Sequence, residues 1–390
     1  MSFDCFREFG KDGVINSIPF NYILSSRNKK LHRYFYKKVT SQNVEKCPVE
    51  YDDGHTINAG IGDVYYITNK LKSYNLEQLP SNLRYYFNNI VTENPNEYQI
   101  LVKNYINDIQ KHRFPPTCKI LLSNGGSTIL IAAFYYAVSK MLDRQITIKS
   151  SLAPPYYALH KQIAEITKNC LWNNSNESSS DIVVIVSPNN PDGRVTSIND
   201  VTNISKYILL DSAYDRPQYT NQTTVNSWKF DLYGNKNFCE INSFSKSGLP
   251  GTRIGYAIIS DDKIYELMNY YVETMALGLN IWSLNNLKSN LSSSLSSVIF
   301  YKGIYTEIQR RYKEIIQIIP QSKIITSKYN TIFVYCSIPY KYFLNINTIV
   351  YSGTHFGETD DYSRINICLS SSEWEIFINR LKKLFGKMQC

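Results

Sequence analysis

The chain has 390 residues, of which 43% are hydrophobic, so it can bury a large core in one large or two smaller domains. Its formal net charge of +9 is spread along the chain, and the densest basic clusters, 27–30 and 380–383, are short, which argues against a nucleic-acid partner. The eight cysteines contain no Cys-x-x-Cys pair, which favours reduced thiols over a disulfide framework or a metal site.

The N-terminal residues lack the basic-then-apolar order of a signal peptide, and no later run reaches about 18 uncharged apolar residues. We therefore expect a cytoplasmic protein with no membrane partner. A change of character near residue 285 divides the chain into a large domain, 50–285, and a small domain built from 1–49 together with 286–390.

Segments of strand type alternate with segments of helix type through the middle of the chain. Strands are predicted at 117–123, 145–149, 181–187 and 207–211, and helices at 127–142 and 154–167. The polar stretch 170–180 is interpreted as a surface loop. This alternation predicts an α/β fold: a three-layer sandwich with a mainly parallel central sheet covered on both faces.

Two further strands, 238–244 and 254–259, flank a polar loop. Beyond residue 285 the sequence predicts a helix at 287–319, strands at 331–335 and 363–368, and a terminal amphipathic helix at 373–385. These elements form the predicted smaller α+β domain. Its terminal helix has an apolar stripe that we assign to core packing: Trp374, Phe377, Leu381 and Leu384.

Polar or glycine-containing turns follow the predicted strands, and such turns meet at one edge of an α/β sheet. The first, Asn124–Thr128, contains Gly126 and Ser127 and is either an anion site at a helix start or a plain turn with a cap. The second contains Tyr157, whose ring either stacks on a planar ligand or packs in the core.

Two more turns offer hydrogen-bonding groups. Ser187–Gly193 carries Asn190, whose amide donates to an oxygen if the turn is not simply at the surface. Asp211 ends a buried apolar strand, and Tyr214 follows it. A carboxylate there needs a partner such as a protonated ring nitrogen, unless it serves as a helix cap.

The loop between the strands 238–244 and 254–259 contains Ser243, Lys246 and Arg253. A lysine amine can form an imine with an aldehyde, although a single loop lysine is usually solvated. The arginine fork matches two phosphate oxygens. Arg364, at the start of a strand in the small domain, either binds a substrate carboxylate or forms a salt bridge at a domain boundary. Together these groups match the needs of a planar, phosphorylated pyridinium aldehyde.

These residues resemble those of the fold-type I enzymes that use pyridoxal 5'-phosphate, the aspartate aminotransferase superfamily. The resemblance covers about 55–370 and is strongest over 120–259. Ser-Pro-Asn-Asn-Pro-Asp-Gly at 187–193 and Asp-Ser-Ala-Tyr-Asp-Arg-Pro-Gln-Tyr-Thr at 211–220 look most like the alliinase and plant tryptophan aminotransferase branch. The resemblance makes 50–285 the cofactor-binding domain.

The resemblance also implies roles for single residues. Lys246 would hold the cofactor as a Schiff base and then move the Cα proton. Asp211 would pair with the ring nitrogen, and Tyr157 would stack on the ring. Tyr214 and Asn190 would hydrogen-bond its phenolic oxygen.

Four residues would bind the cofactor phosphate: Gly126, Ser127, Ser243 and Arg253. Arg364, with Asn190, would bind the substrate carboxylate. The stretch between Lys246 and Arg253 is one residue shorter than relatives usually have.

The resemblance implies an aminotransferase that transfers the amino group of an amino acid to a 2-oxo acid through the Lys246 Schiff base. The alternative is a C–S lyase that catalyses an alliinase-like beta-elimination, and a third possibility is a non-catalytic binding protein on the same scaffold. Related enzymes are homodimers in which a partner-chain tyrosine reaches the phosphate, and Tyr85 and Tyr86 are the candidates for that residue here.

Overall fold

A computed structural model describes residues 57–59, 85–86, 97–110, 114–174, 179–197, 205–220, 226–247, 250–276, 278–291, 294–326 and 330–388. The 1–49 part of the predicted small domain lies outside the described residues, so the predicted division into 50–285 and the remainder stays a prediction. None of the helices in these ranges combines the length and apolarity that a membrane crossing requires.

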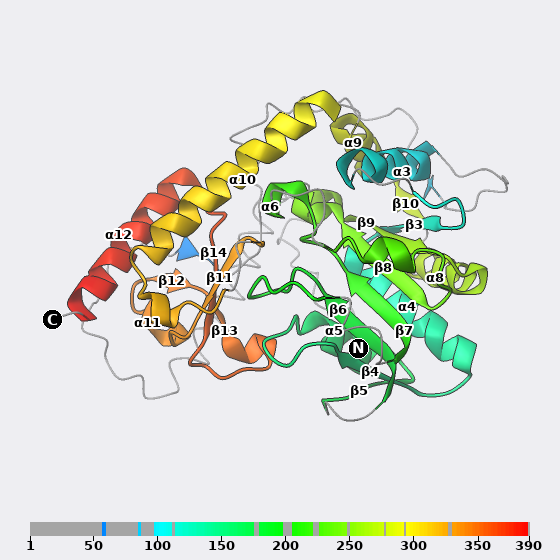
Figure 1. Ribbon diagram of the computed structural model, residues 1–390, viewed down its shortest axis with the longest axis horizontal. Helices are drawn as coiled ribbons and strands as arrows, with labels where there is room; N and C mark the ends of the chain where they lie inside the picture. The colour runs from blue at the N-terminus through cyan, green and yellow to red at the C-terminus, as the bar shows by residue number, and fades with distance from the viewer. Residues whose placement is uncertain are drawn as a thin grey trace, which may run out of the picture. The chain divides into compact units, whose positions relative to one another are not determined.

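A sheet of seven strands, within the described ranges, organises the larger part of the chain (Figure 1). Its order is β3-β9-β8-β7-β6-β4-β5, and β9 runs in the direction opposite to that of the other six strands. The strands are β3 (Lys119–Asn124), β4 (Ile146–Ser150), β5 (Cys170–Trp172), β6 (Ser180–Val186), β7 (Ser205–Asp211), β8 (Phe238–Ser243) and β9 (Ile254–Ile259). The predicted α/β class and mainly parallel sheet are confirmed.

The carboxyl ends of three neighbouring strands lie level with one another. Val186 of β6 pairs with Asp211 of β7, and Asp211 pairs with Ile241 of β8. All seven residues of β6 are buried, as expected for an isoleucine- and valine-rich strand covered on both faces. The loops after these strands therefore open at one edge of the sheet.

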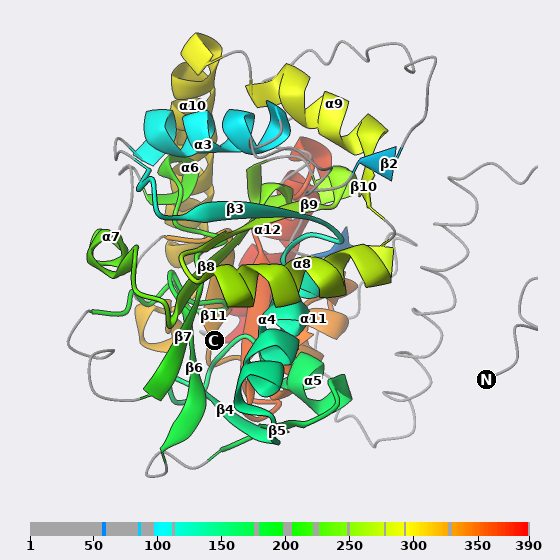
Figure 2. The same cartoon turned by 90° about the vertical axis from the view of Figure 1, so that its right-hand side faces the viewer.

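Helices cover both faces of this sheet (Figure 2). The described ranges contain the helices α3 (Glu97–Gln110), α4 (Ser127–Leu142), α5 (Leu159–Ile166), α6 (Pro217–Thr220), α7 (Lys229–Leu232), α8 (Asp262–Ala276), α9 (Ile281–Leu291), α10 (Ser294–Ile316), α11 (Tyr340–Leu344) and α12 (Ser371–Met388), of which only some contact this sheet. On one face α4, α5 and α8 form the main core with Leu209 and Ile241. On the other, the α7 region packs against Leu210 and Phe238.

A smaller antiparallel sheet of order β11-β14-β13 follows, with β11 at Phe333–Cys336, β13 at Tyr351–Ser352 and β14 at Ser363–Asn366. Two short pairs join distant segments: β1 (Ile57–Asn58) with β12 (Thr348–Ile349), and β2 (Tyr85–Tyr86) with β10 (Leu279–Asn280). All four residues of the predicted α12 stripe are buried, as expected for core packing.

Three expectations need correction. The helix predicted at 154–167 begins only at Leu159, because the backbone N–H of Tyr156, which follows two prolines, donates to Phe356 O at 3.1 Å instead of entering a helix. The stretch 170–180 is not all loop, because Cys170–Trp172 adds the short edge strand β5. The single helix predicted at 287–319 is two helices, α9 ending at Leu291 and α10 beginning at Ser294.

Candidate active site

A cavity of about 370 Å³ opens at the carboxyl edge of the large sheet and is closed on one side by residues of the small sheet. Nine of the ten predicted site residues line it: Ser127, Tyr157, Asn190, Asp211, Tyr214, Ser243, Lys246, Arg253 and Arg364. The tenth, Gly126, precedes Ser127 at the start of α4. Ser127 and Arg364, 237 positions apart in sequence, therefore share one site.

The carboxylate of Asp211, the last residue of β7, has hydrogen-bonding partners at both of its oxygens. The side chain is 3% exposed, its Oδ2 lies 3.2 Å from His160 Nε2, and its Oδ1 accepts a hydrogen bond from Ala213 N at 3.1 Å. His160 Nδ1 in turn lies 3.2 Å from Tyr135 Oη. A buried carboxylate needs such partners, and these fix its orientation at the cavity wall.

Lys246 lies in a 3-10 turn, Phe244–Ser247, that directly follows β8. Its Nζ is 5.6 Å from the ring centroid of Tyr214, which lies three residues beyond Asp211. Its own carbonyl accepts a hydrogen bond from Tyr219 Oη. Lys246 thus follows β8, the neighbour of the strand that ends at Asp211, and both side chains line the same cavity.

The start of α4 forms one end of the cavity with hydroxyl groups and a guanidinium. We call Ser127, Ser243, Ser245 and Arg253 the anion-binding end, after the role that is predicted for three of them. Gly126 has a φ of +70°, and no side chain caps the helix there. A Cβ on Gly126 would lie 3.3 Å from both Ser243 Oγ and Arg253 Nη2, so glycine lets these donors approach the helix start.

Arg253 reaches this end although the loop before it is short. Its backbone is left-handed, with a φ of +55°, and its carbonyl accepts from Gly125 N at 2.6 Å and Gly126 N at 2.7 Å. The guanidinium donates to neutral oxygens, Gly125 O at 2.7 Å and Ser245 Oγ at 3.3 Å. It forms no ion pair with a carboxylate in the described ranges, as expected of a group that binds an anionic ligand.

Arg364 is held in β14 by aromatic rings and an amide. Its Cζ lies 3.9 Å from the ring centroid of Phe333, 4.7 Å from that of Tyr351 and 4.9 Å from that of Phe356. Its Nη1 donates to Asn190 Oδ1 at 2.8 Å. Burial lowers the pKa of Arg364 from its ordinary value. A cation so placed favours an anionic ligand such as a carboxylate.

Asn190 stands in a loop that its neighbour fixes. Asn189 is fully buried and donates from Nδ2 to Pro155 O at 3.0 Å and to Asp192 Oδ1 at 2.8 Å. Asn190 consequently faces the cavity.

The two predicted tyrosines carry neutral hydroxyls near pH 7. Burial raises the pKa of Tyr157 to about 12, with a further contribution from Asp211, and burial raises the pKa of Tyr214 well above its ordinary value. The Tyr157 ring meets His160 edge-on at 5.9 Å. Both hydroxyls therefore remain donors.

Several residues that line the cavity are not among the predicted ones. Ser245, between two predicted residues in Ser-Phe-Ser-Lys, could have been found from the motif itself. Gln162, Phe333, Tyr351, His355 and Phe356 carry no local signal, because only the fold brings their segments to the cavity. For Tyr85 and Tyr86 the structure gives the backbone pairing of β2 alone, so the partner-chain role stays a prediction.

Solved structures share this fold. An aminotransferase from Staphylococcus aureus matches with a TM-score of 0.66 at 16% identity, over 88% of this chain and 98% of that one. Aspartate aminotransferase from Thermotoga maritima matches with a TM-score of 0.65 at 16% identity, over 85% and 92%. The protein therefore has the aspartate aminotransferase-like fold.

The family model described as allinase matches residues 117–344, more than half of the chain, and the chain belongs to this family. Tryptophan aminotransferase-related protein 3 from Arabidopsis thaliana is 26% identical over 316 residues, 69% of this chain and 65% of that protein. L-serine phosphate decarboxylase from Campylobacter jejuni is 28% identical over 224 residues, 51% of this chain and 52% of that protein. The predicted superfamily and branch are confirmed.

The chain spans 65% and 64% of the length of two relatives from Arabidopsis thaliana, tryptophan aminotransferase-related proteins 3 and 4. The family typically uses pyridoxal phosphate. The donor set fits that group, because the space beside Gly126 is bordered by phosphate donors and the buried Asp211 carboxylate suits a protonated ring nitrogen.

Proposed function

We propose that this protein is a pyridoxal-phosphate-dependent aminotransferase that transfers the amino group of an amino acid to a 2-oxo acid. One observation carries the proposal: Lys246 and the buried Asp211 carboxylate line the same cavity as the anion-binding end and Arg364. This reaction needs an amine that binds the aldehyde, a carboxylate beside the ring nitrogen, a site for the phosphate and a site for the substrate carboxylate.

The anion-binding end would hold the cofactor phosphate through its hydroxyls, its guanidinium and the N–H groups at the start of α4. Tyr157 would pack on the ring, Asp211 would face the ring nitrogen, and Asn190 and Tyr214 would donate to the phenolic oxygen. When bound, the cofactor supplies an aldehyde that captures amines and a ring that accepts the electron pair left by a departing Cα proton.

The protein's own residues do the remaining work. The Lys246 amine would hold the cofactor covalently between turnovers and, once freed by the substrate amine, would take up the Cα proton and deliver it to the former aldehyde carbon. The Asp211 carboxylate, oriented by His160, would stabilise the protonated form of the ring nitrogen. Arg364 binds the substrate carboxylate and so orients the Cα–H bond, while Phe333 and Tyr351 exclude water from this contact.

A coupled assay tests this proposal. Protein loaded with pyridoxal phosphate is incubated with a panel of amino acids, with and without a 2-oxo acid, and both products are measured by mass spectrometry. We expect turnover that requires the acceptor and is lost in Lys246→Ala. Acceptor-independent product or full activity of Lys246→Ala would refute the aminotransferase assignment.

The match to the allinase family supports a second candidate, a C–S lyase that eliminates a β-substituent. Both reactions begin with removal of the Cα proton, so Lys246 and Asp211 serve either one. An S-substituted cysteine separates them, because a lyase releases pyruvate without any acceptor. Covalent capture of the cofactor without either reaction would instead favour a binding protein. A homodimer is part of the proposal, and sedimentation equilibrium tests it.

A further inference from the structure

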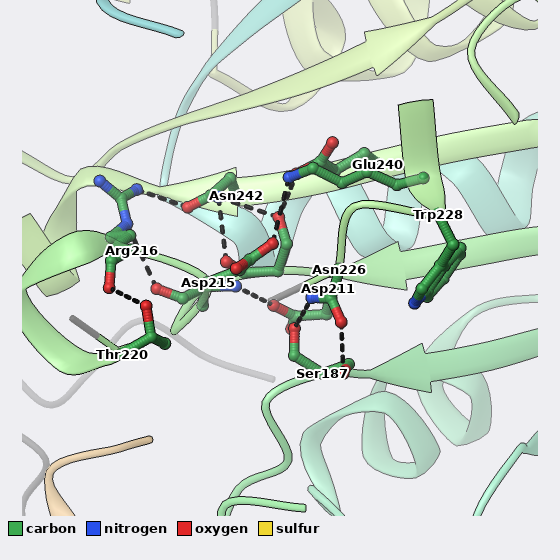
Figure 3. A network of polar contacts seen from close by, with 12 residues as sticks. Ser187, Asp211, Asp215, Arg216, Thr220, Asn226, Trp228, Glu240 and Asn242 are labelled. Atoms are coloured by element: carbon green, nitrogen blue, oxygen red, sulfur yellow. Dashed lines mark hydrogen bonds and ion pairs between the residues drawn. The ribbon is translucent and has the colours of Figure 1, made fainter. Parts of the chain in front are cut away.

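The segment that follows Asp211 also holds the loop that carries Lys246. Within this segment Arg216 is 2% exposed, and Figure 3 shows its guanidinium inside a buried polar network. Its five N–H groups have five acceptors. Nε donates to Ala213 O at 3.3 Å, and Nη1 donates to Tyr105 Oη at 2.9 Å and to Ser247 Oγ. Nη2 donates to Asn242 Oδ1 and to Ser243 O, the second at 2.6 Å.

The acceptors of Arg216 explain why this position is an arginine. All five are neutral oxygens, and a buried guanidinium is tolerated only when its donors are satisfied. Two of them, Ser243 O and Ser247 Oγ, lie on either side of Lys246 in the sequence. A lysine has three donors on one atom and cannot span acceptors so far apart. Arg216 therefore holds the Lys246 turn from both ends.

Tyr219 adds a contact to Lys246 itself. Its Oη donates to the Lys246 carbonyl, and its ring packs on that of Tyr214 with the centroids 5.5 Å apart. Tyr219 is fully buried. One short segment thus contributes Tyr214 to the cavity wall and hydrogen bonds to Lys246 and to residues on either side of it.

The same network reaches back to the strand that carries the acid. Asn242 donates from Nδ2 to Ser212 O at 3.0 Å and to Ser212 Oγ at 2.9 Å, and Ser212 directly follows Asp211. Ser212 Oγ donates to Glu240, which also accepts from Lys229 Nζ at 2.8 Å. The Lys246 turn and the end of β7 are therefore joined by buried hydrogen bonds.

We propose that Arg216 and Tyr219 are positioning residues that hold the backbone of Lys246 so that its amine meets the aldehyde bound against Asp211. This inference rests on the proposed function, because it needs an aldehyde ligand at the site. Neither residue lines the cavity, so both act through Lys246 rather than on the ligand. Misplacement of a reacting group by about 1 Å can cost about 100-fold in rate.

The test separates covalent capture from non-covalent binding. Capture of pyridoxal phosphate is measured as the rate at which borohydride fixes it to Lys246, located by peptide mass spectrometry. Binding is measured by fluorescence with pyridoxine 5'-phosphate, which has the ring and phosphate but no aldehyde. The variants are Tyr219→Phe and Arg216→Gln. The controls, Tyr98→Phe and Arg311→Gln, remove equally buried donors that bond to other residues. Tyr98 Oη donates to Asn285, and Arg311 donates to Glu307, Ile367 O and Leu369 O.

We expect capture to slow about tenfold in Tyr219→Phe, the scale of one buried hydrogen bond, and about 100-fold in Arg216→Gln. Pyridoxine phosphate should bind Tyr219→Phe as it binds the wild type, and both controls should capture at the wild-type rate even if their melting temperatures fall. If Arg216→Gln does not fold, Tyr219→Phe decides alone. Wild-type capture rates in Tyr219→Phe, or slowing matched by lost pyridoxine phosphate affinity, would overturn the inference while leaving the proposed function intact. Absence of capture at Lys246 in the wild type would overturn both.

Discussion

Arg364 of the small sheet donates a hydrogen bond from Nη1 to Oδ1 of Asn190, 2.8 Å away, in the loop that follows β6 of the large sheet. Both side chains line the cavity, and both are buried. The bond places Arg364, which is predicted to bind the substrate carboxylate, next to Asn190, which is predicted to contact the cofactor. The two sheets thus build one site, and Arg364 is the residue proposed to bind the substrate carboxylate there.

Replacing Arg364 by alanine should mainly weaken substrate binding. Loss of one partner of a desolvated charge pair costs about 2–5 kcal/mol, so KM for the amino acid should rise steeply while cofactor capture is retained. The corresponding amine, which lacks the carboxylate, serves as the control ligand and should bind the variant and the wild type alike. An unchanged KM for the amino acid would remove the assigned role.

His160 should act on the reaction through Asp211. In His160→Phe the Asp211 carboxylate loses a buried hydrogen bond, and bonds to charged groups contribute about 1.5–3 kcal/mol, so kcat should fall about 10- to 100-fold with little change in KM. Tyr135→Phe, which removes only the partner of His160 Nδ1, should have a smaller effect. Steady-state kinetics of the two variants check this order, and equal effects would contradict it.

Lys229 should be essential for stability. It is 0% exposed and lies 2.8 Å from Glu240 and 3.3 Å from Asp215, both fully buried. Lys229→Met leaves two buried carboxylates without their cation, so the free energy of unfolding should fall by about 3–5 kcal/mol, measured by urea denaturation. A loss below about 1 kcal/mol, the range of surface pairs, would show that the cluster is solvated.

The pH dependence of the Lys229 contribution follows from its pKa. Burial lowers the pKa of Lys229, but the charges and hydrogen bonds of Glu240 and Asp215 outweigh burial and raise it above the ordinary value. A raised pKa in the folded state means that the stabilisation is complete below the unfolded value of about 10.4 and is lost as pH rises beyond it. The stability difference between wild type and Lys229→Met should therefore narrow only in strong alkali.

Glu307 in α10 should give the opposite pH dependence. Burial raises the pKa of Glu307, but hydrogen bonds and charges from Arg310 and Arg311 outweigh it and lower the pKa to about 2. A lowered pKa means stabilisation that is present above the unfolded value of about 4.3 and lost as pH falls through about 2. The group is partly solvated, so Glu307→Gln should cost no more than about 1 kcal/mol at pH 7. Thermal unfolding should show that difference disappearing in acid.

Much of this fold is predictable from local sequence because its strands are short apolar runs between polar turns. The helix at Ser127–Leu142 and the strand at Ile254–Ile259 have the predicted bounds. The predicted site residues stand at strand ends, where chain order alone implies convergence. Lys246 and Asp211 could be predicted as site residues for this reason.

The remainder depends on contacts that no local pattern encodes. The aromatic residues around Arg364 come from β11, from β13 and from the turn that follows β13, and Phe356 lies 23 residues from Phe333 in the sequence. Arg216 has the sequence context of a surface turn, yet the fold buries it against the Lys246 turn. His160 is a single histidine on a helix, and its proposed role follows only from the fold, which places its ring beside the Asp211 carboxylate.

The most direct measurement is the site of covalent attachment. The protein is incubated with pyridoxal phosphate, reduced with borohydride, digested and analysed by peptide mass spectrometry. The account predicts one stoichiometric adduct on Lys246, absent from Lys246→Ala and competed by pyridoxine phosphate. Labelling scattered over exposed lysines, or an equal adduct yield in Lys246→Ala, would contradict it.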